Sequence, residues 1–192
     1  GNVAPSWSAD FDAWAAEALA AGDIEELCSY RSKAPGMPYA HPTVDHYIPL
    51  FIALGAATDE EIGRELDNDR TASGEREAAY ARALLPTAEN KAQVWQRLTG
   101  GEDVPNWLHR SLLQGFQNVN QVALTAPYAP KFFDVVDEVW KRSDSEPAQE
   151  FVMMAYPAYQ VRQETVALTD EWLSRDGHNS SLRRLVAEGR DG

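Results

Sequence analysis

The sequence predicts an all-α fold, a HEAT-like array of stacked antiparallel helix pairs with an irregular, proline-rich loop near the N-terminus. Apolar residues recur at spacings of three and four, capping residues precede these stripes, and no stretch alternates with the two-residue period of a strand. The 192 residues are 44% hydrophobic and 24% charged, so the chain is long enough and apolar enough to bury a core.

The N-terminal quarter is expected to combine short helices with the loop. An apolar stripe that starts at Phe11 and ends near Gly22 predicts a first helix, and residues 24–30 predict a second. Residues 31–49 contain four prolines and no helical period. Because proline lacks an amide donor and disfavours helix in its predecessor, we expect a fixed, irregular loop there. Residues 50–57 are apolar throughout and are expected to be buried.

The rest of the chain is expected to be a regular series of helices. Residues 58–192 predict eight helices of about 10–14 residues each, joined by short links, which is typical of antiparallel helix pairs. The capping or first apolar residues of these helices are, in chain order, Thr58, Ser73, Thr87, Asp103, Tyr128, Ser145, Leu168 and Leu182.

Charge and cysteine content restrict the partners and the compartment. Acidic residues outnumber basic ones by 30 to 17, for a net charge of −13, and such a chain repels phosphate backbones and anionic lipids. We therefore expect neither nucleic-acid nor membrane binding. No apolar run approaches about 18 residues, and no signal peptide is visible. The single cysteine cannot form an internal disulfide, so a cytoplasmic location is expected.

The histidines are the first candidates for metal ligands. His41 and His46 lie in the proline-rich loop, where rigid placement suits metal ligation, but a histidine in such a loop also serves as a hydrogen-bonding plug. His109 and His178 are expected at the surface. No His-Glu-x-x-His, glycine-rich phosphate loop or Gly-x-Ser-x-Gly occurs. Cys28 lies within an amphipathic helix and is expected to be a packed, inert thiol.

The tryptophans are expected to pack in the core. Most of them fall on apolar stripes, which favours core packing over a ligand cage. These residues are Trp14, Trp95, Trp107, Trp140 and Trp172.

The first part of the chain resembles one enzyme family. Residues 9–57 contain Phe-Asp-Ala-Trp from Phe11 and Ala-His-Pro-Thr-Val-Asp-His-Tyr-Ile-Pro-Leu from Ala40. These blocks are similar to the C-terminal part of LigB-type class III extradiol dioxygenases, near the 4,5-DOPA dioxygenase branch. The resemblance implies that His46, in the Asp-His-Tyr step, is a ligand of a metal such as iron or zinc. It implies no role for His41, and the family's other ligands belong to segments far upstream.

The second part resembles a different family. Residues 65–76 read Glu-Leu-Asp-Asn-Asp-Arg-Thr-Ala-Ser-Gly-Glu-Arg, residues 82–91 read Arg-Ala-Leu-Leu-Pro-Thr-Ala-Glu-Asn-Lys, and residues 182–188 read Leu-Arg-Arg-Leu-Val-Ala-Glu. This order is similar to the helical C-terminal domain of actinobacterial aminopeptidase N, a zinc metallopeptidase of the gluzincin kind. The resemblance implies a domain that covers the catalytic domain, helps to enclose the substrate chamber and supplies no zinc ligand.

These observations lead to three functional hypotheses. The first is a chimera in which a dioxygenase-like fragment, 1–57, is joined to a non-catalytic aminopeptidase N-like domain, 58–192. Such a chain is expected to be inactive alone and to bind the missing catalytic domain or itself. The alternative is a ring-cleaving dioxygenase in which an oligomer brings copies of His41 and His46 together, because one ligand cannot hold a metal. The third is a structural or interaction protein with neither activity.

Overall fold

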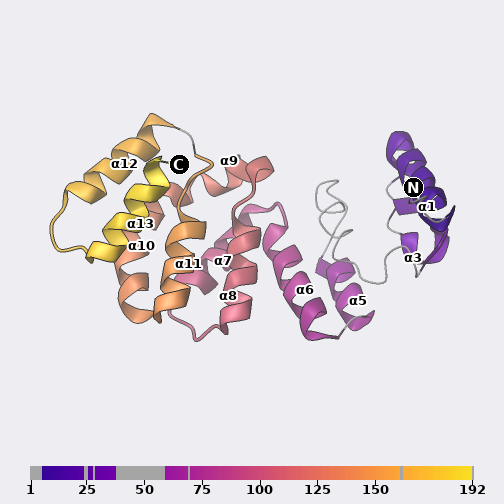
Figure 1. Ribbon diagram of the computed structural model, residues 1–192, viewed down its shortest axis with the longest axis horizontal. Helices are drawn as coiled ribbons and strands as arrows, with labels where there is room; N and C mark the ends of the chain where they lie inside the picture. The colour runs from indigo at the N-terminus through magenta and orange to yellow at the C-terminus, as the bar shows by residue number, and fades with distance from the viewer. Residues whose placement is uncertain are drawn as a thin grey trace, which may run out of the picture. The chain divides into compact units, whose positions relative to one another are not determined.

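The computed structural model forms two compact units, Gly1–Gly74 and Glu75–Gly192 (Figure 1). No strand occurs within the ranges that the structure describes, so the all-α prediction is confirmed. None of the helices in these ranges combines the length and the apolar character needed to cross a membrane. The described ranges are 6–23, 26–27, 29–37, 59–68, 70–160 and 162–191.

The first unit contains helices α1 (Ser6–Ala21), α3 (Tyr30–Lys33) and α5 (Asp59–Asn68). Helix α1 ends where predicted, at Gly22, whose φ of +65° is the left-handed conformation that often ends a helix. Helix α3 occupies the first residues of the expected loop, so the loop prediction is wrong there. Residues 38–58 lie outside the described ranges, and they include the rest of that loop and the predicted domain boundary at 57/58.

One carboxylate ties α1 to α3 within this unit. Glu26 accepts hydrogen bonds from Trp14 Nε1 at 3.0 Å and from Lys33 Nζ at 2.6 Å. These bonds, the one from Lys33 above all, lower the pKa of Glu26 because they stabilise its ionised form.

The helices that follow α5 confirm the sequence-based series and add two short elements. The additional ones are the 3₁₀ turn η1 (Val119–Gln121) and the single-turn helix α9 (Val122–Thr125), which are too short to show a helical period. The predicted helices are α6 (Ala72–Leu84), α7 (Ala88–Thr99), α8 (Asn106–Phe116), α10 (Tyr128–Arg142), α11 (Ser145–Ala155), α12 (Gln163–Ser174) and α13 (Ser180–Asp191).

The helices of the second unit pack as consecutive pairs in two rows. Helix α7 packs on α8, α10 on α11, and α12 on α13, and the short links make each pair antiparallel. The second helices of the pairs also contact one another in the order α8, α11, α13, while α10 contacts α12 (Figure 1). This arrangement is the stacked helical array that the sequence predicts.

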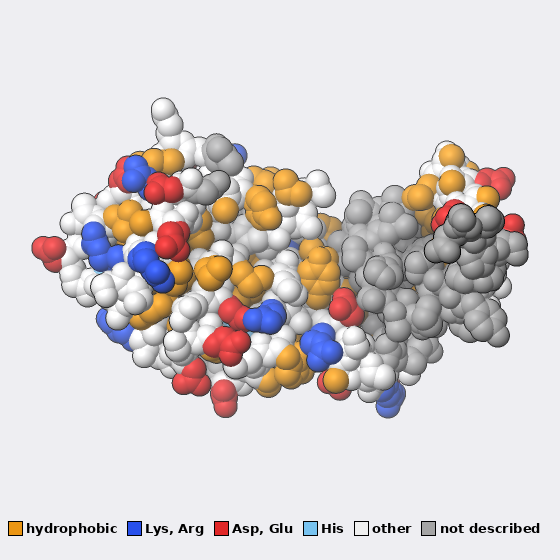
Figure 2. Space-filling model, viewed as in Figure 1, with side chains coloured by type: hydrophobic (Ala, Val, Ile, Leu, Met, Phe, Trp, Pro, Cys, Tyr) orange, Lys and Arg blue, Asp and Glu red, His pale blue; other side chains and the backbone are white. Residues whose placement is uncertain are grey.

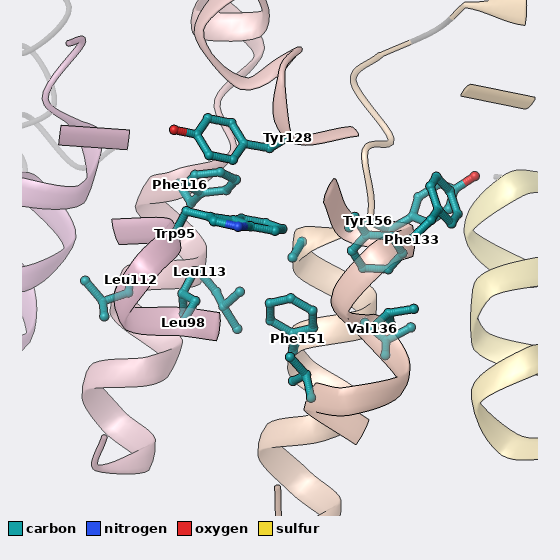
Figure 3. Close-up of a cluster of buried hydrophobic side chains, with 14 of the residues drawn as sticks. Trp95, Leu98, Leu112, Leu113, Phe116, Tyr128, Phe133, Val136, Phe151 and Tyr156 are labelled. Atoms are coloured by element: carbon teal, nitrogen blue, oxygen red, sulfur yellow. The ribbon is translucent and has the colours of Figure 1, made fainter. Parts of the chain in front are cut away.

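An aromatic cluster fills the space between the rows. The ring of Trp95 lies 5.2 Å from Tyr128, 5.5 Å from Phe116 and 6.1 Å from Phe151, between ring centroids (Figure 3). These rings come from α7, α8, α10 and α11, so one cluster joins two helix pairs. Each large ring removes about 150–250 Å² from water, which makes the cluster a main source of stability.

A buried lysine joins α6, α7 and α8. The side chain of Lys91 is 0% exposed, and its Nζ donates to the carbonyl oxygens of Ala83 at 2.8 Å and Gly115 at 2.9 Å. Burial lowers the pKa of Lys91 from 10.5 to about 8, because the charged form loses its hydration. The ammonium group supplies a donor to each carbonyl, and the Ala83 carbonyl would otherwise have only a long contact of 3.4 Å from Asn90 Nδ2.

Two amide side chains complete the capping of α6. Asn90 Nδ2 donates to the carbonyls of Arg82 at 2.8 Å and Leu85 at 3.1 Å, and Gln121 Nε2 donates to that of Leu84 at 2.7 Å. The last carbonyls of a helix have no partner within the helix, and here later elements supply the donors. The end of α6 is therefore held by side chains from two places in the chain, α7 and η1.

Glycine at position 115 allows α8 to approach α6 closely. A Cβ atom on Gly115 would lie 2.5 Å from the Cβ of Ala83 and 2.6 Å from the carbonyl oxygen of Tyr80. We expect Gly115→Ala to lower the free energy of unfolding by about 1–3 kcal/mol, as overpacking does, despite the better helix propensity of alanine. Chemical denaturation measures this, and the Ala83→Gly/Gly115→Ala pair should recover part of the loss. A stability equal to wild type would contradict the close approach.

Replacing Lys91 should destabilise the fold in a pH-dependent way. Lys91→Met removes the ammonium donor from the carbonyls of Ala83 and Gly115 and leaves Ala83 with only the 3.4 Å contact from Asn90 Nδ2, which costs about 1–3 kcal/mol. Between pH 8 and 10.5 the unfolded wild-type state binds more protons than the folded state, because the folded pKa is the lower one. Wild-type stability relative to Lys91→Met should therefore rise as the pH increases from 7 to 9.5.

Urea denaturation at a series of pH values checks this expectation. Lys141→Met, at an exposed position of α10, is the matched control and should show no such trend. A stability difference between wild type and Lys91→Met that stays constant or shrinks with pH would be inconsistent with the buried cation.

Candidate functional site

The second unit contains an open groove of about 1060 Å³ between α6, α8 and α11. Helix α8 contributes a face in which the lining residues recur every three or four positions, and the segment after α11 closes one end. Figure 2 shows acidic and basic side chains beside hydrophobic ones on the face where α8 and α11 lie. The groove is larger than the pocket of about 330 Å³ beside Arg97 and His109, and we take it as the candidate binding site.

Large apolar side chains along this groove are exposed. Trp107 on α8 is 40% exposed and Met153 on α11 is 67% exposed, and Tyr159 after α11 is exposed as well. The sequence-based prediction that Trp107 packs in the core is wrong. It lies at the same face as Arg110 and Gln114, whereas Leu112 and Phe116 make up the buried face of α8. Trp107 precedes the charged residue Arg110 by three positions, so the two side chains share one face of α8. This spacing was the signal in the sequence that could have identified Trp107 as exposed.

An ion triad lies in the groove. Arg110 Nε donates to Glu150 Oε1 at 2.8 Å, and its Nη2 also bonds Glu150 and lies 3.9 Å from Glu146 Oε1. The two glutamates are four residues apart on α11 and so share one face. Hydrogen bonding to Glu150 raises the pKa of Arg110, because it stabilises the cation. Two carboxylates around one guanidinium leave the triad with a negative charge.

Hydrogen bonds from Gln117 hold the end of α11 that borders the groove. Gln117 Nε2 donates to the carbonyls of Ala155 at 3.1 Å and Tyr156 at 3.0 Å. The hydroxyl of Tyr156 lies 2.9 Å from the Thr169 hydroxyl, and burial raises the pKa of Tyr156. These contacts fix the backbone from which the groove residues after α11 project.

The two described histidines are not at the surface, so that expectation is wrong. His109 is only 8% exposed, and burial lowers its pKa because the charged form is poorly solvated. The ring of His178 stacks on Trp172 with centroids 3.7 Å apart. Its Nδ1 lies 2.9 Å from Asp137 Oδ1 and its Nε2 lies 3.0 Å from the Trp172 carbonyl oxygen. His178 therefore fastens α12 to α10.

The other candidate residues fall outside the described part of the chain. His41, His46 and Cys28 all lie there, so metal ligation by His46 and the packed thiol of Cys28 stay predictions. Among the described residues, no three His, Cys, Asp or Glu side chains come together in a group that could hold a metal ion.

Comparison with known proteins identifies relatives of both parts of the sequence. Residues 48–192 match the family of the ERAP1-like C-terminal domain. The aminopeptidase N of Streptomyces lividans is 38% identical over 146 residues, which cover 76% of this chain. The chain spans only 17% of that relative's length.

Shorter matches connect the chain to a second group of proteins. The 4,5-DOPA dioxygenase extradiol of Beta vulgaris is 42% identical over 67 residues, covering 35% of this chain and 25% of the relative. The protein of the same name from Portulaca grandiflora is 44% identical over 60 residues, covering 31% and 22%. Both resemblances that the sequence motifs indicate are thus confirmed as similarities.

We expect the ion triad to contribute to the stability of the α8–α11 contact. Arg110→Ala should lower the melting temperature at low ionic strength, because Glu146 and Glu150 then repel each other without a cation between them. The decrease should shrink in 1 M salt. Arg175→Ala is the control, since Arg175 pairs with Glu171 within one exposed helical turn. Equal, salt-independent effects of both substitutions in thermal unfolding would argue against the triad.

Proposed function

The chain belongs to the family of ERAP1-like C-terminal domains, and from this premise we propose that it acts as the non-catalytic helical domain of an aminopeptidase N-like zinc metallopeptidase. In this role it covers a catalytic domain and helps to enclose the substrate chamber. A dioxygenase-like segment is joined to its N-terminal side. The observation that carries the proposal is the family match over residues 48–192.

The surface chemistry of the second unit supports a docking role. Trp107 and Met153 leave apolar area exposed along one face, which is typical of a surface that a partner covers. Tryptophan, methionine and arginine are enriched at protein interfaces, and Arg110 adds a guanidinium to this groove. The matched part of Streptomyces lividans aminopeptidase N is 17% of that protein, so most of the relative is available to form the partner surface.

The dioxygenase alternative has less support. The chain covers 25% of the Beta vulgaris protein and 22% of the Portulaca grandiflora protein. The resemblance supplies one metal ligand, His46, and a single side chain binds a catalytic metal too weakly to hold it. This function therefore depends on an oligomer that combines ligands from several copies.

Fragment complementation tests the proposed function. The purified chain is mixed with the Streptomyces lividans aminopeptidase N from which the matching C-terminal part has been removed. Hydrolysis of aminoacyl-p-nitroanilides is then followed in the presence of zinc. We expect no turnover by the chain alone and a concentration-dependent gain in kcat/KM when the two parts are combined, since closing the chamber positions the substrate.

A pair of matched variants tests whether the gain in kcat/KM depends on the groove. Trp107→Ala should weaken complementation at least tenfold, whereas Val119→Ala, which removes an exposed apolar side chain outside the groove, should leave it unchanged. Turnover by the chain alone would reject a non-catalytic role. Failure of the parts to associate in analytical ultracentrifugation would reject docking, and light scattering of the chain alone would reveal whether the apolar groove drives self-association instead.

A further inference from the structure

Two adjacent methionines on α11 lie in different environments. Met153 is 67% exposed, the largest exposed fraction among the described large hydrophobic side chains. Met154 is partly buried and packs against the core cluster that contains Phe151 and Val152. Both line the groove. Since successive helix residues point about 100° apart, one thioether faces solvent while its neighbour faces the core.

We propose that Met153 is a site of reversible oxidation by hydrogen peroxide, and that its sulfoxide changes binding in the groove while leaving the fold intact. A lone pair on the sulfur atom of Met153 attacks one oxygen atom of the peroxide. The S–O bond forms as the O–O bond breaks, and the other oxygen leaves as water after proton transfer. Sulfur loses two electrons and the peroxide gains them. A thiol-dependent sulfoxide reductase reverses the change.

The position of Met153 explains why oxidation there acts on binding rather than on folding. The side chain makes no part of the buried core, so a polar oxygen on its sulfur creates no buried unsatisfied group. The groove that it lines also contains Trp107 and Tyr159, whose exposed rings provide the apolar surface. A sulfoxide converts this flexible apolar contact into a polar, chiral one. Only this effect on binding rests on the proposed docking function.

Peroxide treatment of the full chain followed by fragment mass spectrometry tests the chemistry. Met153 should gain its oxygen at least tenfold faster than Met154, and the singly oxidised protein should keep the wild-type melting temperature. Met153→Leu should lose the fast phase, and Met154→Leu should keep it. Met37 and Cys28 are followed on separate peptides. Equal rates at Met153 and Met154, or a lowered melting temperature after the fast phase, would overturn the proposal.

The effect on binding is tested with the catalytic part of the Streptomyces lividans enzyme. Oxidised wild type should bind at least threefold more weakly than untreated wild type, and peroxide-treated Met153→Leu should bind as well as its untreated form. Treatment of the oxidised protein with methionine sulfoxide reductase should restore the affinity, which would show that the oxidation is reversible. If untreated wild type binds but oxidation changes nothing, the inference fails while the docking function stands. If untreated wild type does not bind, the docking function and this effect on binding fail together, and the oxidation chemistry is judged from the mapping alone.

Discussion

The geometry of the second unit depends on how the carbonyls at the end of α6 are satisfied. Lys91 donates to one carbonyl on α6 and one on α8, and Asn90 and Gln121 supply the neighbouring donors. Burying an ammonium group is costly, and the shift of the Lys91 pKa from 10.5 to about 8 corresponds to about 3 kcal/mol. This cost is offset because the ammonium group of Lys91, on α7, bonds one carbonyl of α6 and one of α8 and so joins the three helices. The groove lies directly beside this junction, since α6 and α8 form part of its lining.

Elsewhere in the array, amide side chains also donate hydrogen bonds to backbone carbonyls of neighbouring elements. Gln117 on the segment after α8 reaches the end of α11, and Gln160 after α11 donates to the carbonyl of Val122 at 2.7 Å. Gln117 thus pairs a carbonyl at the end of α11, whereas Gln160 shares the Val122 carbonyl with the backbone amide of Ala126. Such bonds fix the relative positions of the helices without adding apolar area. The groove face can therefore leave Trp107 and Met153 exposed instead of using them for packing.

The sequence predicted the helices well and the groove poorly, for identifiable reasons. The stripe from Tyr128 through Phe132 to Val139 and the cap at Thr87 act locally, and local patterns determine where a helix begins and which face it buries. His178 and Trp107 were misplaced because their environments depend on distant residues. The Nδ1 atom of His178 lies 2.9 Å from Asp137 Oδ1, and Asp137 is 41 positions away, while Trp107 is exposed because its side of α8 faces the open groove. Contacts between residues that are far apart in the sequence produce no periodic pattern from which they could be predicted.

The pair α12 and α13 ends the array in a particular way. Trp172 seals its inner side, while the outward side chains form ion pairs, Arg175 with Glu171, Arg190 with Asp170, and Arg184 with Glu188. This exterior is mainly charged and hydrated, and Val166 of α12 is an exposed large hydrophobic side chain of the pair. Desolvating these ion pairs would cost free energy, so the charged face of α12 and α13 is a poor surface for stacking against the same face of a second copy.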